Sequence, residues 1–363
     1  MKPSRLTTDQ FDQLAAATGE NLVSIAIPTH RRGRDVAQDP VRLKNELAEV
    51  DAQLEERGMK PRQRDQLLQQ ATETLDDVEF WEHQADQLAV FIEDDGSTTT
   101  LAVSEETGGA PSHVGDRFYV RYVLPDLDPI LLPVLVLTQN FVGLYSADLV
   151  SARRLEVDLP ESLEDVNWFV DRESQRQQHP DRAGSQRNRH GHEPSADREA
   201  DLDRFLRAVA RELPESLPAP LVVLGDDPVV GRFAQTYEGE MLSPEHSGTR
   251  EPSDSVVHEI AFPTLEEHRR RVRASAAERA AEALGTGSAT PDASEAIREA
   301  RQGRIGELVL TQGSGAEADD DPEGEGSHYL RNEAVIEAHQ TGAKLSIIDD
   351  AVDGNELVEI RRY

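Results

Sequence analysis

The residues best suited to chemistry lie in a polar segment of the chain, residues 172–199. From Arg172 to His192 it carries five arginines and three histidines against two acidic residues, Glu173 and Asp181. The whole chain has a net charge of -32, so a locally basic segment departs from its background. Because the segment is almost free of apolar residues, we expect an exposed, mobile loop. Long loops of this kind are usually functional or disordered. We therefore interpret the segment either as an arm that reaches into an anionic partner or as a disordered surface loop.

The histidines of this segment allow a second interpretation. His190 and His192 are one residue apart, and on an extended strand both imidazoles would point to the same side. Together with His179 and with Asp181 or Glu193 they are the residue types that bind zinc, which favours a metal-dependent hydrolase as an alternative function. A catalytic metal needs rigidly held ligands and a supporting shell, which a loop does not supply. We therefore assign no metal site and no cofactor to the chain.

A second concentration of basic residues follows the predicted strand at residues 22–27. The turn at its end could hold a phosphate or be a solvated turn. Asp39 and Pro40 are typical of a helix start, and Arg42 and Lys44 near that start work against the helix dipole. An anion or RNA contact is therefore a hypothesis for this region. Its candidate residues are His30, Arg31, Arg32, Arg34, Arg42 and Lys44.

A third basic run lies in a long helix that we predict to begin with a capping box at Thr264 and Glu267. The run contains four arginines within two turns: Arg269, Arg270, Arg271 and Arg273. It is typical of a solvated helix face, and an RNA-facing stripe is the alternative.

Apolar runs with helical and strand periods alternate along the chain, which predicts an α/β (α+β) fold of mixed sheets flanked by helices. Predicted strands include residues 88–93, 99–103, 118–123, 131–137, 142–146, 152–157, 220–225, 306–311, 343–348 and 357–360. Residues 131–137 and 142–146 should form a hairpin. Phe80 and Trp81 are interpreted as core residues. Polar and Pro/Gly-rich stretches divide the chain into three predicted domains, at residues 1–125, 126–250 and 251–363.

The composition limits the function classes. Acidic residues number 70 against 38 basic ones, and only four of the basic residues are lysines, which suggests adaptation to high salt; a mesophilic acidic protein is the alternative. The absence of cysteine excludes disulfides, thiolate metal sites and a cysteine nucleophile. No apolar run reaches 18 residues, and the start of the sequence lacks a signal-peptide pattern, so we expect a cytoplasmic protein without a membrane partner.

Two blocks of sequence resemble those of a known family. Residues 27–33, Ile-Pro-Thr-His-Arg-Arg-Gly, together with residues 38–45, are similar to the opening of bacterial relatives of the archaeo-eukaryotic peptide-release factors. Residues 303–310 and 358–363 resemble the last domain of those factors and of the ribosome-rescue protein Pelota. The resemblance implies a release-factor-like architecture. The implied function is that of a translation factor in the ribosomal A site, acting in rescue, hibernation or peptidyl-tRNA hydrolysis.

The resemblance also assigns a role to the central segment. In the family a Gly-Gly-Gln loop enters the peptidyl-transferase centre, and this chain has Gly184, Ser185 and Gln186 at the comparable place. Serine reaches positive φ only at a cost, so the departure at Ser185 leaves open whether the chain is an enzyme, a peptidyl-tRNA hydrolase, or only occupies the site. The implied partners are ribosomal RNA, tRNA and a translational GTPase. The RNA-contact candidates of this segment are Arg182, Arg187, Arg189, His190 and His192. A non-catalytic adaptor with a disordered basic loop is the remaining alternative.

Overall fold

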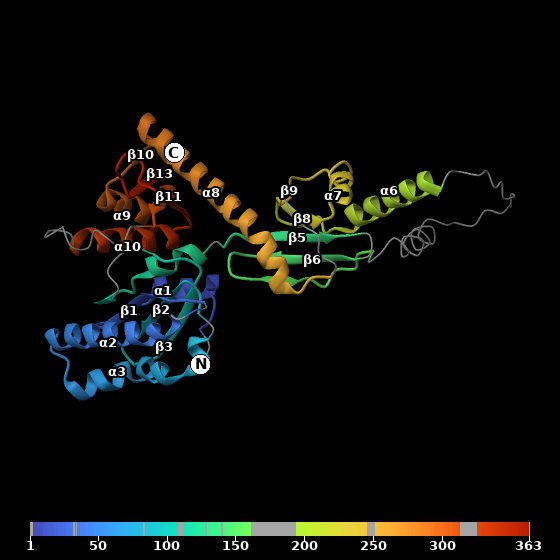
Figure 1. Cartoon of the computed structure of the whole chain (residues 1–363). Helices are drawn as coiled ribbons and strands as arrows, with labels where there is room; N and C mark the ends of the chain where they lie inside the picture. The colour runs from blue at the N-terminus through green and yellow to red at the C-terminus, as the bar shows by residue number, and fades with distance from the viewer. Residues whose placement is uncertain are drawn as a thin grey trace, which may run out of the picture. The chain divides into compact units, whose positions relative to one another are not determined.

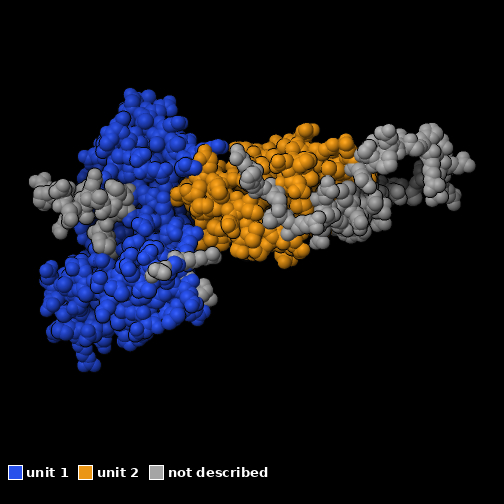
Figure 2. Space-filling model, in the orientation of Figure 1, with its two compact units in different colours: residues 1–129, 270–363 blue, residues 130–269 orange. Residues whose placement is uncertain are grey.

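The chain divides into two compact units (Figures 1 and 2). Unit 1 comprises residues 1–129 and 270–363, and unit 2 comprises residues 130–269. A computed structural model describes residues 3–31, 33, 35–82, 84–107, 112–127, 129–138, 141–160, 194–244, 251–312 and 325–362. Within them the strands form two four-stranded sheets in unit 1 and one five-stranded sheet in unit 2. The predicted class of mixed α/β sheets flanked by helices is confirmed.

The first sheet of unit 1 has the order β3-β2-β1-β4, and all its pairs are antiparallel. Its strands are β1 (Leu22–Pro28), β2 (Gln87–Ile92), β3 (Thr98–Val103) and β4 (Ser112–Gly115). One face packs on α2 (Asp39–Glu56) and α3 (Pro61–Glu73), because Leu43, Leu47 and their neighbours at helical spacing form one apolar stripe. Phe80 and Trp81 of the short α4 (Val78–Trp81) join this core, as predicted.

The second sheet of unit 1 has the order β10-β13-β11-β12. Its strands are β10 (Ala289–Thr290), β11 (Ile305–Thr311), β12 (Lys344–Ile348) and β13 (Leu357–Arg361). Strand β11 pairs parallel with β12 and antiparallel with β13, so this sheet is mixed. Three helices accompany it: α8 (Asp254–Thr286), of which residues 270–286 belong to this unit, α9 (Ala293–Arg301) and α10 (Glu325–Gln340).

The two ends of the chain share one hydrophobic core in unit 1. Phe11 of α1 (Thr8–Ala16) and Phe91 of β2 belong to the same buried cluster as Leu308 of β11 and Val335 of α10. The 3₁₀ segment η3 (Val120–Asp126) lies in this cluster as well. A buried hydrogen bond accompanies the apolar contact, because the Asn332 side-chain amide donates to the carbonyl of Phe118 over 2.9 Å. Segments more than 200 residues apart thus form one unit.

Unit 2 is built on a sheet of order β7-β6-β5-β8-β9. Its strands are β5 (Leu132–Leu137), β6 (Val142–Ala147), β7 (Ala152–Arg154), β8 (Leu221–Gly225) and β9 (Met241–Leu242). The predicted β5–β6 hairpin is confirmed. Helices α6 (Pro194–Glu212) and α7 (Asp227–Phe233) contribute to the core on one face of the sheet, and residues 254–269 of α8 contribute to the core on the other.

Three local predictions are wrong. Residues 118–123 form no strand: residues 120–126 are the buried 3₁₀ segment η3, and a short apolar run cannot be assigned by period alone. Strand β4 lies in a stretch for which no strand was predicted. Helix α8 begins at Asp254 and contains Pro263, so Thr264 lies inside the helix and is not its N-cap.

Among the described residues no helix has the length and apolar character needed to span a membrane. The division into three domains stays a prediction.

Candidate nucleic-acid interface

The turn after β1 is fixed to the residues that precede β2. Thr29 is buried, and its hydroxyl donates to the carbonyl of Ala85 over 3.0 Å, while its N–H donates to the carbonyl of Asp86 over 2.9 Å. Arg31 donates two parallel hydrogen bonds to the carboxylate of Asp86, from Nε to Oδ1 over 2.8 Å and from Nη2 to Oδ2 over 3.0 Å. A fork of this kind sets the plane of the guanidinium as well as its position.

Asp39 is the centre of the turn. Its side chain is fully buried at the start of α2 and accepts three hydrogen bonds. The donors are the His30 N–H at 2.9 Å, the His30 Nδ1 at 3.0 Å and the Arg42 Nη1 at 2.7 Å. Because a carboxylate can only accept, the contact at Nδ1 is a hydrogen bond in the forms of His30 that carry a proton on that nitrogen. The prediction that Asp39 caps α2 is wrong, because the N-cap is Gln38, which makes no side-chain cap bond.

The structure therefore brings together three of the predicted contact residues, His30, Arg31 and Arg42, which we call the β1 cluster. Their side chains are each about one-third exposed, at 35 %, 31 % and 33 %. Lys44 lies exposed on the next turn of α2, and Arg32 and Arg34 lie outside the described residues. Each arginine of the cluster already faces a carboxylate, so the cluster offers oriented donors with little net positive charge.

Sequence reasoning missed the two carboxylates that position the cluster. Asp86 is 55 residues from Arg31 in the chain, and no local pattern marks the pair. Asp39 was interpreted from its local spacing as a cap, whereas its partners lie in the preceding turn and one helical turn ahead. The sequence does contain a signal for one of these contacts. Asp39 stands three residues before Arg42, and side chains at that spacing on a helix are neighbours.

One arginine of the α8 run departs from both predicted roles. Arg270 and Arg271 are exposed, as a solvated helix face requires, whereas Arg273 is buried. Arg273 is only 7 % exposed. Its guanidinium binds Glu105 (2.9 and 2.5 Å), Asp349 (2.6 Å) and Gln312 (3.0 Å). Burial alone would lower the pKa of Arg273, but Glu105 and Asp349 raise it. Arg273 therefore joins distant segments of unit 1 and is neither a solvated nor an RNA-facing residue.

Most of the predicted central site lies outside the described residues. This holds for the whole of residues 161–193, hence for the Gly184-Ser185-Gln186 tripeptide, for the basic residues Arg182, Arg187, Arg189, His190 and His192, and for the histidines of the zinc hypothesis. Within the described part of the chain no group of three or more histidine or acidic side chains is placed to hold a metal ion.

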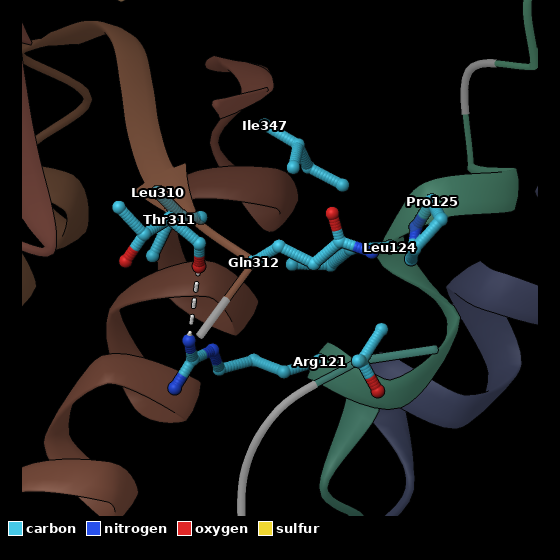
Figure 3. A pocket seen from close by; sticks show the side chains of 8 residues that line it. Arg121, Leu124, Pro125, Leu310, Thr311, Gln312 and Ile347 are labelled. Atoms are coloured by element: carbon cyan, nitrogen blue, oxygen red, sulfur yellow. Dashed lines mark hydrogen bonds between the residues drawn. The ribbon is translucent and has the colours of Figure 1, made fainter. Parts of the chain in front are cut away.

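A small hollow in unit 1 shares no residue with the β1 cluster (Figure 3). Its polar wall is Arg121, which is 6 % exposed and donates to the Tyr119 hydroxyl over 3.1 Å and to the carbonyl of Thr311 over 3.4 Å. The remaining lining residues are Thr107, Leu124, Pro125, Leu310, Thr311, Gln312 and Ile347. Its walls are mostly apolar and its arginine is already engaged, so the hollow lacks the converging polar groups of a catalytic site.

Comparison with known proteins identifies the sequence family of the central region. Residues 133–304 match the model of bacterial archaeo-eukaryotic release factor family 3. The predicted resemblance to bacterial relatives of the release factors is confirmed. The matched region spans unit 2 from β5 onward and continues through α9. It therefore contains the central segment as well. Comparison with curated proteins gave no match.

Solved structures of release-factor and Pelota proteins are also similar to the chain. An archaeal translation termination factor, aRF1, is 14 % identical over 99 % of both chains, with a TM-score of 0.25. Dom34 of S. cerevisiae, a translation termination-like factor interacting with Hbs1, is 11 % identical over 77 % of this chain and 73 % of its own, with a TM-score of 0.35. Ribosome-bound archaeal Pelota is 9 % identical over 100 % and 96 %, with a TM-score of 0.36. The family match itself rests on the sequence of residues 133–304.

Proposed function

We propose that the chain is a ribosome-associated translation factor of the release-factor and Pelota type. The observation that carries the proposal is the family match over residues 133–304, which encloses the basic central segment. In this proposal the factor occupies the ribosomal A site, and the segment with Gly184, Ser185 and Gln186 reaches the peptidyl-transferase centre. The setting is cytoplasmic, and a translational GTPase is the partner that delivers the factor.

The β1 cluster of unit 1 supports a second RNA contact of such a factor. His30, Arg31 and Arg42 present nitrogen donors that Asp39 and Asp86 hold in place. Donors of this kind suit phosphate and sugar oxygens, which position a protein without reading base sequence. Because the carboxylates offset the charge, we expect orientation and shape, more than counterion release, to supply the affinity of this contact.

Ribosome binding is the first test. The full chain should co-sediment with 70S ribosomes at near-native salt, and binding should weaken for His30→Ala combined with Arg42→Gln. The matched control is Arg298→Gln combined with Arg301→Gln, which removes exposed arginines from α9. If the parent stays out of the ribosomal fractions under all salt conditions, the proposed function is wrong.

Catalysis is a separate question, which a single-turnover release assay on peptidyl-tRNA-loaded ribosomes can answer. If the second residue of the tripeptide takes a positive φ, a serine there costs about 1–2 kcal/mol relative to glycine. That cost corresponds to about a tenfold loss in rate. We therefore expect Ser185→Gly to release peptide about tenfold faster than the parent, and Gln186→Ala to abolish release. Equal, background rates for all three would leave occupancy of the site as the function.

A further inference from the structure

Helix α6 follows the central segment and carries three arginines on one face. Arg204, Arg207 and Arg211 are spaced i, i+3 and i+7, so they lie along one side of the helix. All three are exposed, and about half of the side-chain surface is accessible for Arg204 (53 %) and Arg211 (49 %). In unit 2 the helix extends past the ends of β5 and β6 (Figure 1). We call these three residues the α6 arginine face.

The other sides of α6 have different partners. Phe205, Leu206 and Val209 are buried in the core of unit 2. Glu199 and Asp203 turn to α7, where Arg232 binds them over 3.0 Å each. The helix thus has an apolar side on the core, an acidic side on α7 and a solvent side on which the three arginines lie beside Asp201 and Glu212. Two of its carboxylates are thereby already bound by an arginine of another helix.

Each arginine of the face has a partner within its own helix. Arg204 pairs with Asp201 over 3.1 Å and Arg211 with the adjacent Glu212 over 3.2 Å, while Arg207 donates to the backbone carbonyl of Asp203 over 3.0 Å. Exposed pairs of this kind contribute about 0–1 kcal/mol, so they hold the guanidinium groups weakly. A phosphate group accepts charge-assisted and often bidentate hydrogen bonds from a guanidinium, so it can replace these weakly held partners.

We infer that the α6 arginine face binds the phosphate backbone of ribosomal RNA beside the central segment. This inference rests on the proposed function and adds a named contact surface to it. A row of arginines along one helix face is the electrostatic footprint of a nucleic-acid contact. In a chain with a net charge of -32, a basic face of this kind gives the RNA a local point of approach. The contact fixes position and reads no base sequence.

The test compares two triple variants of the full chain that lose the same charge. Arg204→Gln/Arg207→Gln/Arg211→Gln removes the α6 arginine face. Arg298→Gln/Arg301→Gln/Arg304→Gln removes three equally exposed arginines in and after α9. Ribosome affinity is measured over a series of KCl concentrations, and thermal unfolding confirms that both variants fold.

We expect the α6 variant to lose at least tenfold in affinity and the control to lose less than twofold. The slope of log K against log salt should fall in magnitude by about 2 for the α6 variant, because each phosphate contact contributes about 0.7–0.9. Equal losses for the two variants, or none for either, would overturn the inference while leaving the proposed function intact. A parent that does not bind ribosomes defeats both.

A second measurement identifies the partner class. A photoreactive residue introduced as Arg207→p-benzoylphenylalanine should crosslink to ribosomal RNA in the complex. Crosslinks to ribosomal proteins alone would overturn the assignment to RNA, even if the affinity loss were observed.

Discussion

Two helices of this protein use arginine for opposite purposes. In α8, Arg273 is buried and binds two carboxylates from distant parts of unit 1. In α6, Arg204, Arg207 and Arg211 are exposed and pair with neighbours along their own helix. The sequence shows a run of arginines in both places. What separates the two roles is the depth of the side chain and the chain distance to its carboxylate, and neither can be seen in a local pattern.

The largest expected effect is on stability, at Arg273. Arg273→Leu removes the guanidinium and leaves Glu105 without its partner in a poorly solvated place, so the free energy of unfolding should fall by about 3 kcal/mol or more. Denaturant unfolding of the full chain measures it. The matched change Arg298→Leu, at a side chain that is 61 % exposed, should alter stability by less than about 0.5 kcal/mol. Equal effects at the two sites would break the comparison.

The β1 cluster provides the same contrast between two aspartates. Asp39→Asn should destabilise the chain by about 1–3 kcal/mol, because a fully buried acceptor of three bonds loses its charge beside Arg42. Asp86→Asn, at a side chain that is 47 % exposed, should cost less than about 1 kcal/mol although Arg31 loses its fork. The urea midpoints of the two variants measure the difference. A larger loss for Asp86→Asn than for Asp39→Asn would show that burial does not determine which aspartate stabilises the fold more.

The buried carboxyl group of Glu359 should make the stability of the protein depend on pH. Both carboxylate oxygens of Glu359 are buried without a hydrogen-bond partner. Burial raises the pKa of Glu359 to about 7, while Arg361 lowers it and Glu299 and Glu295 raise it further. The folded state therefore favours the protonated acid. This contribution to stability is present below the ordinary pKa near 4.5 and is lost as pH rises through about 7.

Glu359→Gln replaces the acid by a neutral side chain of the same shape. We expect the variant to unfold at a temperature about 3 °C or more above the parent at pH 8.5, and within about 1 °C of it at pH 5. Scanning calorimetry at both pH values measures the difference. A gain in melting temperature that is the same at both pH values would contradict the ionisation argument.

The smallest stability effect should be at the α6 arginine face. Arg211→Gln should change the free energy of unfolding by less than about 0.5 kcal/mol, because Arg211 and its partner Glu212 are both exposed. The same holds for Arg204→Gln. A loss of more than about 1 kcal/mol by denaturant unfolding would show that these arginines stabilise the fold, as Arg273 does.

The regular elements were predictable because their cause is local. The apolar run of β1 and the helical spacing of Leu43 and Leu47 in α2 locate those elements from the sequence. The failures have a common cause, because each depends on what another part of the chain supplies. Residues 118–123 are extended in appearance but form a 3₁₀ segment inside a core shared with α10. Asp86 was not recognised as a partner of Arg31 for the same reason.

The core shared by α1, β2, β11 and α10 has a consequence for the growing polypeptide. While the chain is being synthesised, Phe11 and Phe91 emerge long before Leu308 and Val335, so one side of the first sheet stays uncovered until α10 has been synthesised. Residues 130–269 have a separate core and can fold during that interval. A nascent chain arrested before α10 should therefore expose an apolar surface to chaperones, and synthesis of α10 should close it.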